Sequence, residues 1–159
     1  MTKSILIDIA EEYFKKTNRG PTEWNFYTFQ YNNKIKPRKI ENARKKFAPY
    51  DLETEIPIIV VDSTILRSGK DGVFITNKAV YYYLVNINGK GWRKGKVEWD
   101  EIEELLFVPK LSGSYFVING VKIGQFGAFS QSGKADKEEG NVLNALFELW
   151  TDALKELRM

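Results

Sequence analysis

Apolar residues in the middle of the chain recur in three short runs that are separated by turn-forming residues. The run 56–61 is rich in β-branched side chains, which favour a strand buried on both faces. Pro57 has no amide hydrogen to donate, so we expect it at the first residue of this strand or on an edge. The runs 73–76 and 79–84 flank a gap with the spacing of a two-residue hairpin. The pattern therefore predicts the start of an antiparallel meander.

The same alternation predicts four further strands. They cover residues 96–99, 105–109, 115–118 and 121–124, and residues 92–95 can extend the pairing of the first. Asn119-Gly120 separates the last two strands and favours the type I′ turn, because the twist of that turn matches the twist of paired strands. The sequence thus predicts about seven antiparallel strands.

Apolar residues at helical spacing mark three segments outside the strands. Two of them, residues 4–17 and 38–47, precede the meander. Residues 127–140 are polar and predict a loop, and Gly140 suggests that the last helix starts near Asn141. From there to the end of the chain, one strongly apolar face predicts a helix that packs on the sheet.

Composition excludes several kinds of site. The 159 residues include no cysteine and no histidine. Disulfides, zinc–sulfur sites, nucleophiles activated by histidine and iron sites with two histidines are excluded, because each needs one of these residues. We expect no metal and no cofactor, and an enzyme would have to use Asp, Glu, Lys, Tyr or Ser alone.

The N-terminal segment does not have the pattern of a signal peptide. Asp8, Glu11 and Glu12 interrupt the apolar residues where a signal peptide needs a continuous core. No apolar run approaches the length of about 20 residues that spans a bilayer. We therefore expect a soluble, cytoplasmic protein.

The formal net charge of +3 is unevenly distributed along the chain. Residues 1–50 hold 11 Lys/Arg against 5 Asp/Glu, whereas residues 51–159 hold 13 against 16. Much of the excess lies in one basic stretch, whose cations are Lys34, Lys36, Arg38, Lys39, Arg44, Lys45 and Lys46. It follows the aromatic-rich residues 22–31, which we interpret as a short strand or an extended cover over the core. These cations could hold phosphates while the rings stack on bases or enter a lipid interface; the alternative is a solvated helix with its apolar face on the sheet.

Two other groups of residues have a functional and a structural interpretation. Five carboxylates lie at the end of the fourth predicted strand or just after it: Glu98, Asp100, Glu101, Glu103 and Glu104. Acid–base chemistry by paired carboxylates needs one of them in an environment that raises its pKa, and a solvated rim is the simpler interpretation. Trp92, Trp99 and Trp150 are expected in the core, with their indole N–H groups hydrogen-bonded.

The order of elements and two short motifs resemble bacterial pleckstrin-homology-like (PH-like) domains, a group of uncharacterised function. Residues 71–82, DGVFITNKAVYY, resemble the hairpin of those domains, and residues 97–102, VEWDEI, resemble their I-x-W-x-E-I strand. The resemblance covers about residues 55–158 and implies an α+β fold, a barrel of about seven antiparallel strands closed by a C-terminal helix. We expect residues 51–159 to form this domain and residues 1–50 to form a helical, basic extension packed on it.

The resemblance implies a fold more than a function. Eukaryotic PH domains bind inositol phosphates through the loop between their first two strands, but here that loop offers only Arg67 and Lys70, so a simple turn is the better interpretation. Such barrels leave an open sheet edge and a groove beside the C-terminal helix, where a peptide can bind by strand addition or helix packing. We therefore expect a non-catalytic module that binds a protein or peptide, and a homo-oligomer would also fit. The alternatives are an anionic membrane surface or nucleic acid bound through residues 34–46 and, third, an enzyme.

Overall fold

The computed structural model describes residues 2–16, 27–29, 35–62, 70–87, 90–110, 114–125 and 133–159. Within these ranges the elements are, in chain order, α1 (Thr2–Lys16), β1 (Tyr27–Phe29), α2 (Pro37–Lys46), β2 (Pro57–Asp62), β3 (Gly72–Thr76), β4 (Ala79–Val85), β5 (Trp92–Glu98), the 3-10 helix η1 (Trp99–Glu101), β6 (Leu105–Val108), β7 (Tyr115–Ile118), β8 (Val121–Gln125) and α3 (Gly133–Arg158).

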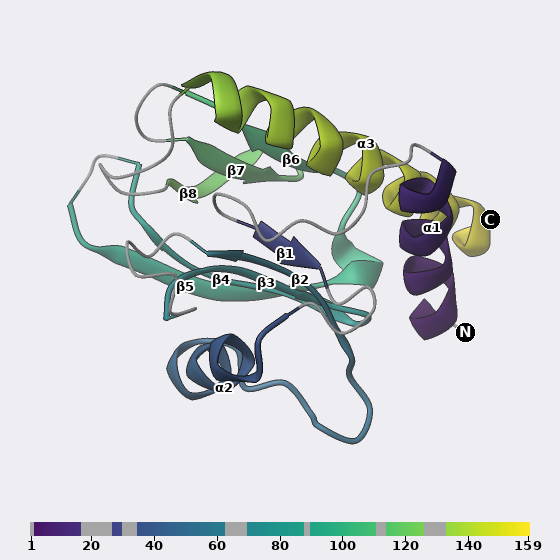
Figure 1. The fold of residues 1–159 in the computed structure, drawn as a ribbon, viewed down its shortest axis with the longest axis horizontal. Helices are drawn as coiled ribbons and strands as arrows, with labels where there is room; N and C mark the ends of the chain where they lie inside the picture. The colour runs from purple at the N-terminus through teal and green to yellow at the C-terminus, as the bar shows by residue number, and fades with distance from the viewer. Residues whose placement is uncertain are drawn as a thin grey trace.

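The described strands form one curled antiparallel sheet. Its order is β1-β2-β3-β4-β8-β7-β6, and β5 pairs with β4 beside this path. Figure 1 shows two facing layers, β2 to β5 and β6 to β8, with α3 running along β6 and α2 on the opposite side of the molecule. Because β6 ends the order, one of its edges has no strand partner in the described part of the chain. This barrel-like sheet with N-terminal and C-terminal helices confirms the predicted α+β architecture at that level.

Local sequence determines several turns as predicted. Asn119 and Gly120 have positive φ angles of 51° and 79°, as a type I′ turn between β7 and β8 requires. Asn77 and Lys78 connect β3 to β4. Pro57 is the first residue of β2, where its missing amide hydrogen removes no bond from the middle of the strand. The predicted aromatic-rich segment contains a short strand, β1, which pairs with β2.

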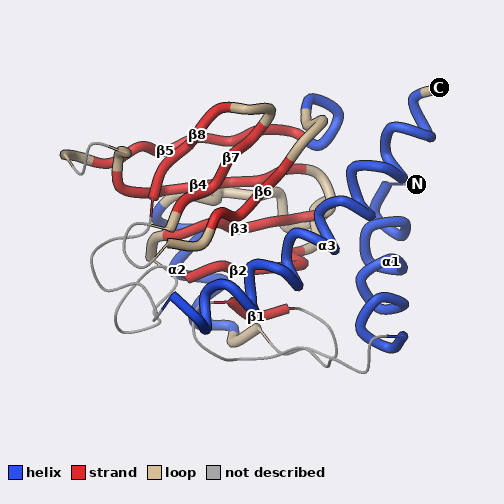
Figure 2. The backbone as a smooth tube through the Cα atoms, turned by 90° about the horizontal axis from the view of Figure 1, so that it is seen from above, coloured by secondary structure: helices blue, strands red, loops and turns tan. Residues whose placement is uncertain are grey.

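Two tryptophans connect the sheet with the terminal helices. Trp99 and Trp150 are fully buried, and their rings meet edge to face at 5.6 Å. The Trp99 indole donates to the carbonyl of Thr76 at 2.8 Å, and that of Trp150 donates to the carbonyl of Leu6 at 2.8 Å. Figure 2 shows α1 beside the end of α3, where both chain termini lie. The prediction of buried tryptophans with bonded N–H groups is confirmed at these two positions.

A second, smaller core lies between α2 and the outer face of the sheet. Ala43 and Phe47 are buried there against residues of β2 to β4, which include Val60, Phe74 and Tyr81. The outer face of β2 is therefore covered as well as the inner one, which explains why its β-branched run is buried on both sides. The apolar face predicted for residues 38–47 is the face that makes this contact.

Three sequence predictions are wrong. The loop predicted over residues 127–140 is helical from Gly133 onward, so α3 starts well before Asn141; residues 126–132 lie outside the described ranges. A Cβ atom on Gly140 would lie 3.0 Å from Cδ2 of Phe107, so this glycine lets the helix approach β6 closely and does not end it. Trp99 belongs to η1 and not to the preceding strand, and Trp92 is 50% exposed on β5.

Candidate functional site

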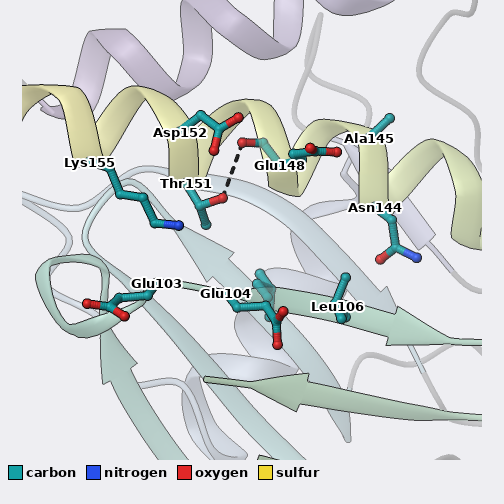
Figure 3. Close-up of a pocket in the computed structure, with 10 residues that line it drawn as sticks. Glu103, Glu104, Leu106, Asn144, Ala145, Glu148, Thr151, Asp152 and Lys155 are labelled. Carbon is teal, nitrogen blue, oxygen red and sulfur yellow. Dashed lines mark hydrogen bonds between the residues drawn. The ribbon is translucent and has the colours of Figure 1, made fainter. Parts of the chain in front are cut away.

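A groove of about 650 Å³ lies between β6 and α3. Its lining residues come from the start of β6, from the two residues before it, and from α3: Glu103, Glu104, Leu105, Leu106, Asn144, Ala145, Glu148, Thr151, Asp152 and Lys155. Figure 3 shows the side chains of α3 above this space and those of Glu103, Glu104 and Leu106 below it. The groove therefore runs along the edge of β6 that carries no strand partner among the described residues.

One side chain of α3 binds the main chain of this edge. The N–H of Phe107 donates to Oδ1 of Asn144 at 2.8 Å, and Nδ2 of Asn144 donates to the carbonyl of Phe107 at 2.9 Å. The side-chain amide of Asn144 thus forms the two hydrogen bonds with the β6 edge that a peptide group of an added strand would form. Both polar groups of Phe107 consequently point away from β7, toward α3.

The geometry of an antiparallel strand extends this observation to Leu105. The main-chain groups of alternate residues point to the same side of a strand, so those of Leu105 point the same way as those of Phe107. Leu105 lines the groove, whereas Asn144 lies opposite Phe107. The N–H and C=O of Leu105 therefore face α3, but Leu105 as a whole is only 2% exposed, so a ligand strand must displace the side chains that cover this residue before it can pair with these groups.

The groove carries an excess of negative charge. Glu103, Glu104, Glu148 and Asp152 are exposed along it, and Lys155 is the single cation among its lining residues. Asn119 fixes the segment that leads into β6, because its Oδ1 accepts from the N–H groups of Glu103 at 2.7 Å and Glu104 at 3.0 Å. Two members of the predicted acidic group therefore stand at fixed positions on one wall, where they attract a cationic ligand.

The remaining members of the acidic group lie outside the groove. Glu98, Asp100 and Glu101 are exposed, as a solvated rim predicts. Among the described residues no cluster of three or more acidic side chains is arranged to hold a metal ion. The groove itself was not predictable from local spacing, because Asn144 and Phe107 are 37 positions apart.

The predicted basic stretch is not a single exposed patch. Lys34 lies outside the described residues, Lys36, Arg38, Lys45 and Lys46 are exposed, and Lys39 is only 7% exposed. The Arg44 guanidinium lies over the ring of Tyr50 at 5.3 Å. Lys45 forms an ion pair with Glu41 at 2.9 Å, and this bond lowers the pKa of the Glu41 carboxyl. Four cations of α2 and its N-terminal flank thus remain open to solvent, while Lys39 and Arg44 contribute to the packing of the helix.

The two loop candidates contribute little to a site. Arg67 lies outside the described residues, and Lys70 is exposed just before β3. Neither belongs to the residues that line the groove.

A buried carboxylate forms hydrogen bonds beside the second core. Glu55 accepts hydrogen bonds from the hydroxyls of Thr76 at 2.7 Å and Tyr81 at 2.9 Å. Burial, and then the bond to Glu55, raises the pKa of the Tyr81 hydroxyl above its usual value. Because Tyr81 is only 3% exposed, this perturbed group serves the structure and is not open to a substrate.

Three aromatic rings form a stack that reaches from the second core to the surface. Phe47 lies 6.2 Å from Tyr83, and Tyr83 lies 5.0 Å from Trp92, with interplanar angles of 29° and 28°. Alternation along β5 could have indicated the exposure of Trp92. In a strand it shares a face with Lys94 and Lys96, and a tryptophan among lysines is not on a core face.

Comparison with known proteins gives no match: no protein-family model, no curated protein and no solved structure matches the chain. Within the described ranges, none of the helices has both the length and the apolar composition that crossing a membrane requires.

Proposed function

We propose that the chain is a non-catalytic binding module of PH-like fold that binds an extended, basic segment of a partner protein between β6 and α3. The observation that carries the proposal is a groove of about 650 Å³, with Leu105 among its lining residues, along the edge of β6 that has no strand partner among the described residues. The element order supports the PH-like part, since seven strands from β2 to β8 precede a C-terminal helix.

Strand addition is the binding mode that fits this edge. In this mode a strand of the partner, here called the guest, forms main-chain hydrogen bonds with the sheet edge, and its side chains on either face give specificity. The amide of Asn144 already occupies the position opposite Phe107. A guest would therefore extend the edge at Leu105, next to Asn144, and would lie between residues 103–106 and the helix.

Charge defines the chemistry of the guest. Four exposed carboxylates and one lysine line the groove, so lysine or arginine side chains of a peptide meet an attractive field and acidic side chains meet a repulsive one. Leu106 and Ala145 add partly buried apolar surface on the two walls. A peptide that alternates basic and apolar residues matches both features, because successive side chains of a strand point to opposite sides.

The proposal can be tested by calorimetry with two capped peptides of about eight residues, the length of an ordinary strand. One alternates Lys and Val, and the other alternates Glu and Val. We expect the basic peptide to bind and the acidic peptide not to bind. Failure of the basic peptide to bind at low salt would contradict the proposal.

Two variants of α3 make the test specific for the groove. Ala145→Arg places a long cationic side chain in the groove and should weaken binding of the basic peptide at least about tenfold, or about 1.4 kcal/mol. Leu149→Arg is the matched control, because Leu149 is exposed on the same helix but does not line the groove. It should leave the affinity unchanged, and equal losses in the two variants would place the peptide elsewhere.

A further inference from the structure

A second surface of the molecule combines an exposed ring with cations. We call it the Trp92 face and define it by Lys46 of α2, Tyr83 of β4, and Trp92, Lys94, Lys96 and Glu98 of β5. Trp92 is 50% exposed and stacks on Tyr83 at 5.0 Å. In Figure 1, β5 and α2 lie on the side of the molecule away from α3, so this face is separate from the groove.

Strand register places these residues on one side of the sheet. Lys94 pairs with Tyr83, and Lys96 pairs with Tyr81. Residues that are directly opposite in an antiparallel pair share a face, and so do alternate residues of one strand. Tyr81 belongs to the core under α2, so Trp92, Lys94 and Lys96 lie on the outer face that α2 partly covers.

The cations lie close to the rings. Nζ of Lys46 is 5.5 Å from the centre of the Tyr83 ring, and Nζ of Lys96 is 5.5 Å from that of Tyr81. Glu98 is the only acid of the face, and it lies 3.6 Å from Lys96. With three lysines and one glutamate, the face carries a net charge of +2, opposite in sign to that of the groove.

We propose that the Trp92 face binds single-stranded nucleic acid. The ring stack runs from Phe47, which is 4% exposed, to the half-exposed ring of Trp92. A base can add to the open end of this stack, while Lys46, Lys94 and Lys96 neutralise the phosphates on either side of it. Stacking on aromatic side chains beside a positively charged surface is how proteins bind single strands without sequence preference.

The geometry of Trp92 favours a flat ligand over a membrane. A residue that anchors a protein in a bilayer projects its ring into the lipid interface. Trp92 instead lies against Tyr83, with an angle of 28° between the ring planes. Its open surface is therefore suited to a base, and anionic vesicles serve as the competing probe in the test.

The experiment measures fluorescence anisotropy of labelled oligo-dT and oligo-rU of about 12 nucleotides, within the site sizes of single-strand binding surfaces. A duplex of equal length and vesicles rich in phosphatidylserine are the other two probes. We expect binding to the single strands and weaker binding to the duplex, whose bases are stacked on each other. Neutralisation of phosphates by three lysines should weaken single-strand binding about 20-fold between about 50 and about 200 mM salt.

Substitutions assign the binding to this face. Trp92→Ala should weaken binding about 5- to 150-fold, the effect of losing one base–aromatic stack, whereas Trp92→Phe should retain most of the affinity. Lys94→Ala should reduce the salt dependence, and Lys110→Ala, an exposed lysine outside both the groove and the Trp92 face, should not. Thermal denaturation of each variant separates loss of binding from loss of the fold.

Three results would overturn the inference. They are absence of single-strand binding at low salt, equal affinity of Trp92→Ala and the unsubstituted chain, and binding to vesicles alone. β5 pairs only with β4 among the described strands, and its lysines would then only prevent its other edge from pairing with other chains. Because peptide binding is measured separately on Ala145→Arg, either proposal can fail without the other.

Discussion

The side-chain amide of Asn144 binds both the N–H and the C=O of Phe107, at 2.8 and 2.9 Å, and so joins α3 to the edge of β6 that has no strand partner among the described residues. The pair connects a helix near the end of the chain with a strand 37 positions earlier. It also shows which main-chain groups of β6 point away from the sheet. Asn144 also lines the groove, together with Leu105.

Asn144→Ala should therefore lower the free energy of unfolding by about 1–3 kcal/mol, because two main-chain groups lose their partner. Asp152→Ala, an exposed position on the same helix, is the matched control. Asn and Asp have similar helix propensities, so replacement by alanine raises the helix propensity by the same amount in both variants. Urea denaturation measures the difference, and equal stability of the two variants would show that the Asn144 bonds contribute nothing.

Trp150→Phe should destabilise the protein by about 1–3 kcal/mol, since it removes a buried indole and its bond to Leu6. Hydrogen exchange should increase in α1, because this bond joins α1 to α3. Trp92→Phe, the same substitution at a half-exposed position, should change stability by less than about 0.5 kcal/mol. A larger loss at Trp92 than at Trp150 would contradict the assigned core.

Gly124→Ala and Gly120→Ala should differ in cost although both glycines have positive φ. Gly120, with φ of 79°, has no heavy atom within 4 Å of an added Cβ, whereas at Gly124, with φ of 153°, the added Cβ would lie 2.5 Å from Cβ of Leu84. The backbone strain alone costs about 1–3 kcal/mol, and the steric clash adds about 1–3 kcal/mol at Gly124. Chemical denaturation measures both, and equal losses would be incompatible with this close approach of β8 to β4.

Stability should fall at alkaline pH through Tyr81. Its pKa in the folded protein lies above the ordinary value of 10.0, so the unfolded chain loses this proton first as the pH rises. The unfolded state then binds fewer protons than the folded state, and the free energy of unfolding decreases with pH. The stabilisation is complete below about pH 10 and is lost toward the higher pKa of the folded state.

Tyr81→Phe tests this prediction. The variant loses the bond to Glu55, so it should be less stable near neutral pH by about 1–3 kcal/mol. Its free energy of unfolding should decrease less than that of the unsubstituted chain between about pH 9 and about pH 11. Parallel pH profiles for the two proteins would rule out Tyr81 as the group responsible.

The sequence predicted what local chemistry determines. Asn119-Gly120 defines a type I′ turn because both residues tolerate positive φ, and Pro57 can only begin its strand. The start of α3 is predicted wrongly because Gly140 does not end a loop. This glycine lets the helix approach Phe107, which is a contact between distant segments of the chain. For the same reason no local pattern could indicate the groove, since its walls come from separate parts of the chain.

Two predicted features needed the structure for their interpretation. The basic stretch is visible in the sequence, but the burial of Lys39 depends on how α2 packs on the sheet. Trp92 was expected in the core because tryptophan is usually buried, although its alternation with Lys94 and Lys96 indicates an outward face. Pairing of β5 with β4 then brings these lysines beside the tyrosines of β4.

Amide hydrogen exchange at Leu105, followed by NMR with and without the Lys/Val peptide, tests the proposed strand addition most directly. The peptide should slow exchange of the Leu105 N–H, which points away from β7, and should leave exchange of the Leu106 N–H, which points to β7, unchanged. Binding of the peptide with unchanged exchange at Leu105, or with protection confined to α2, would contradict the account.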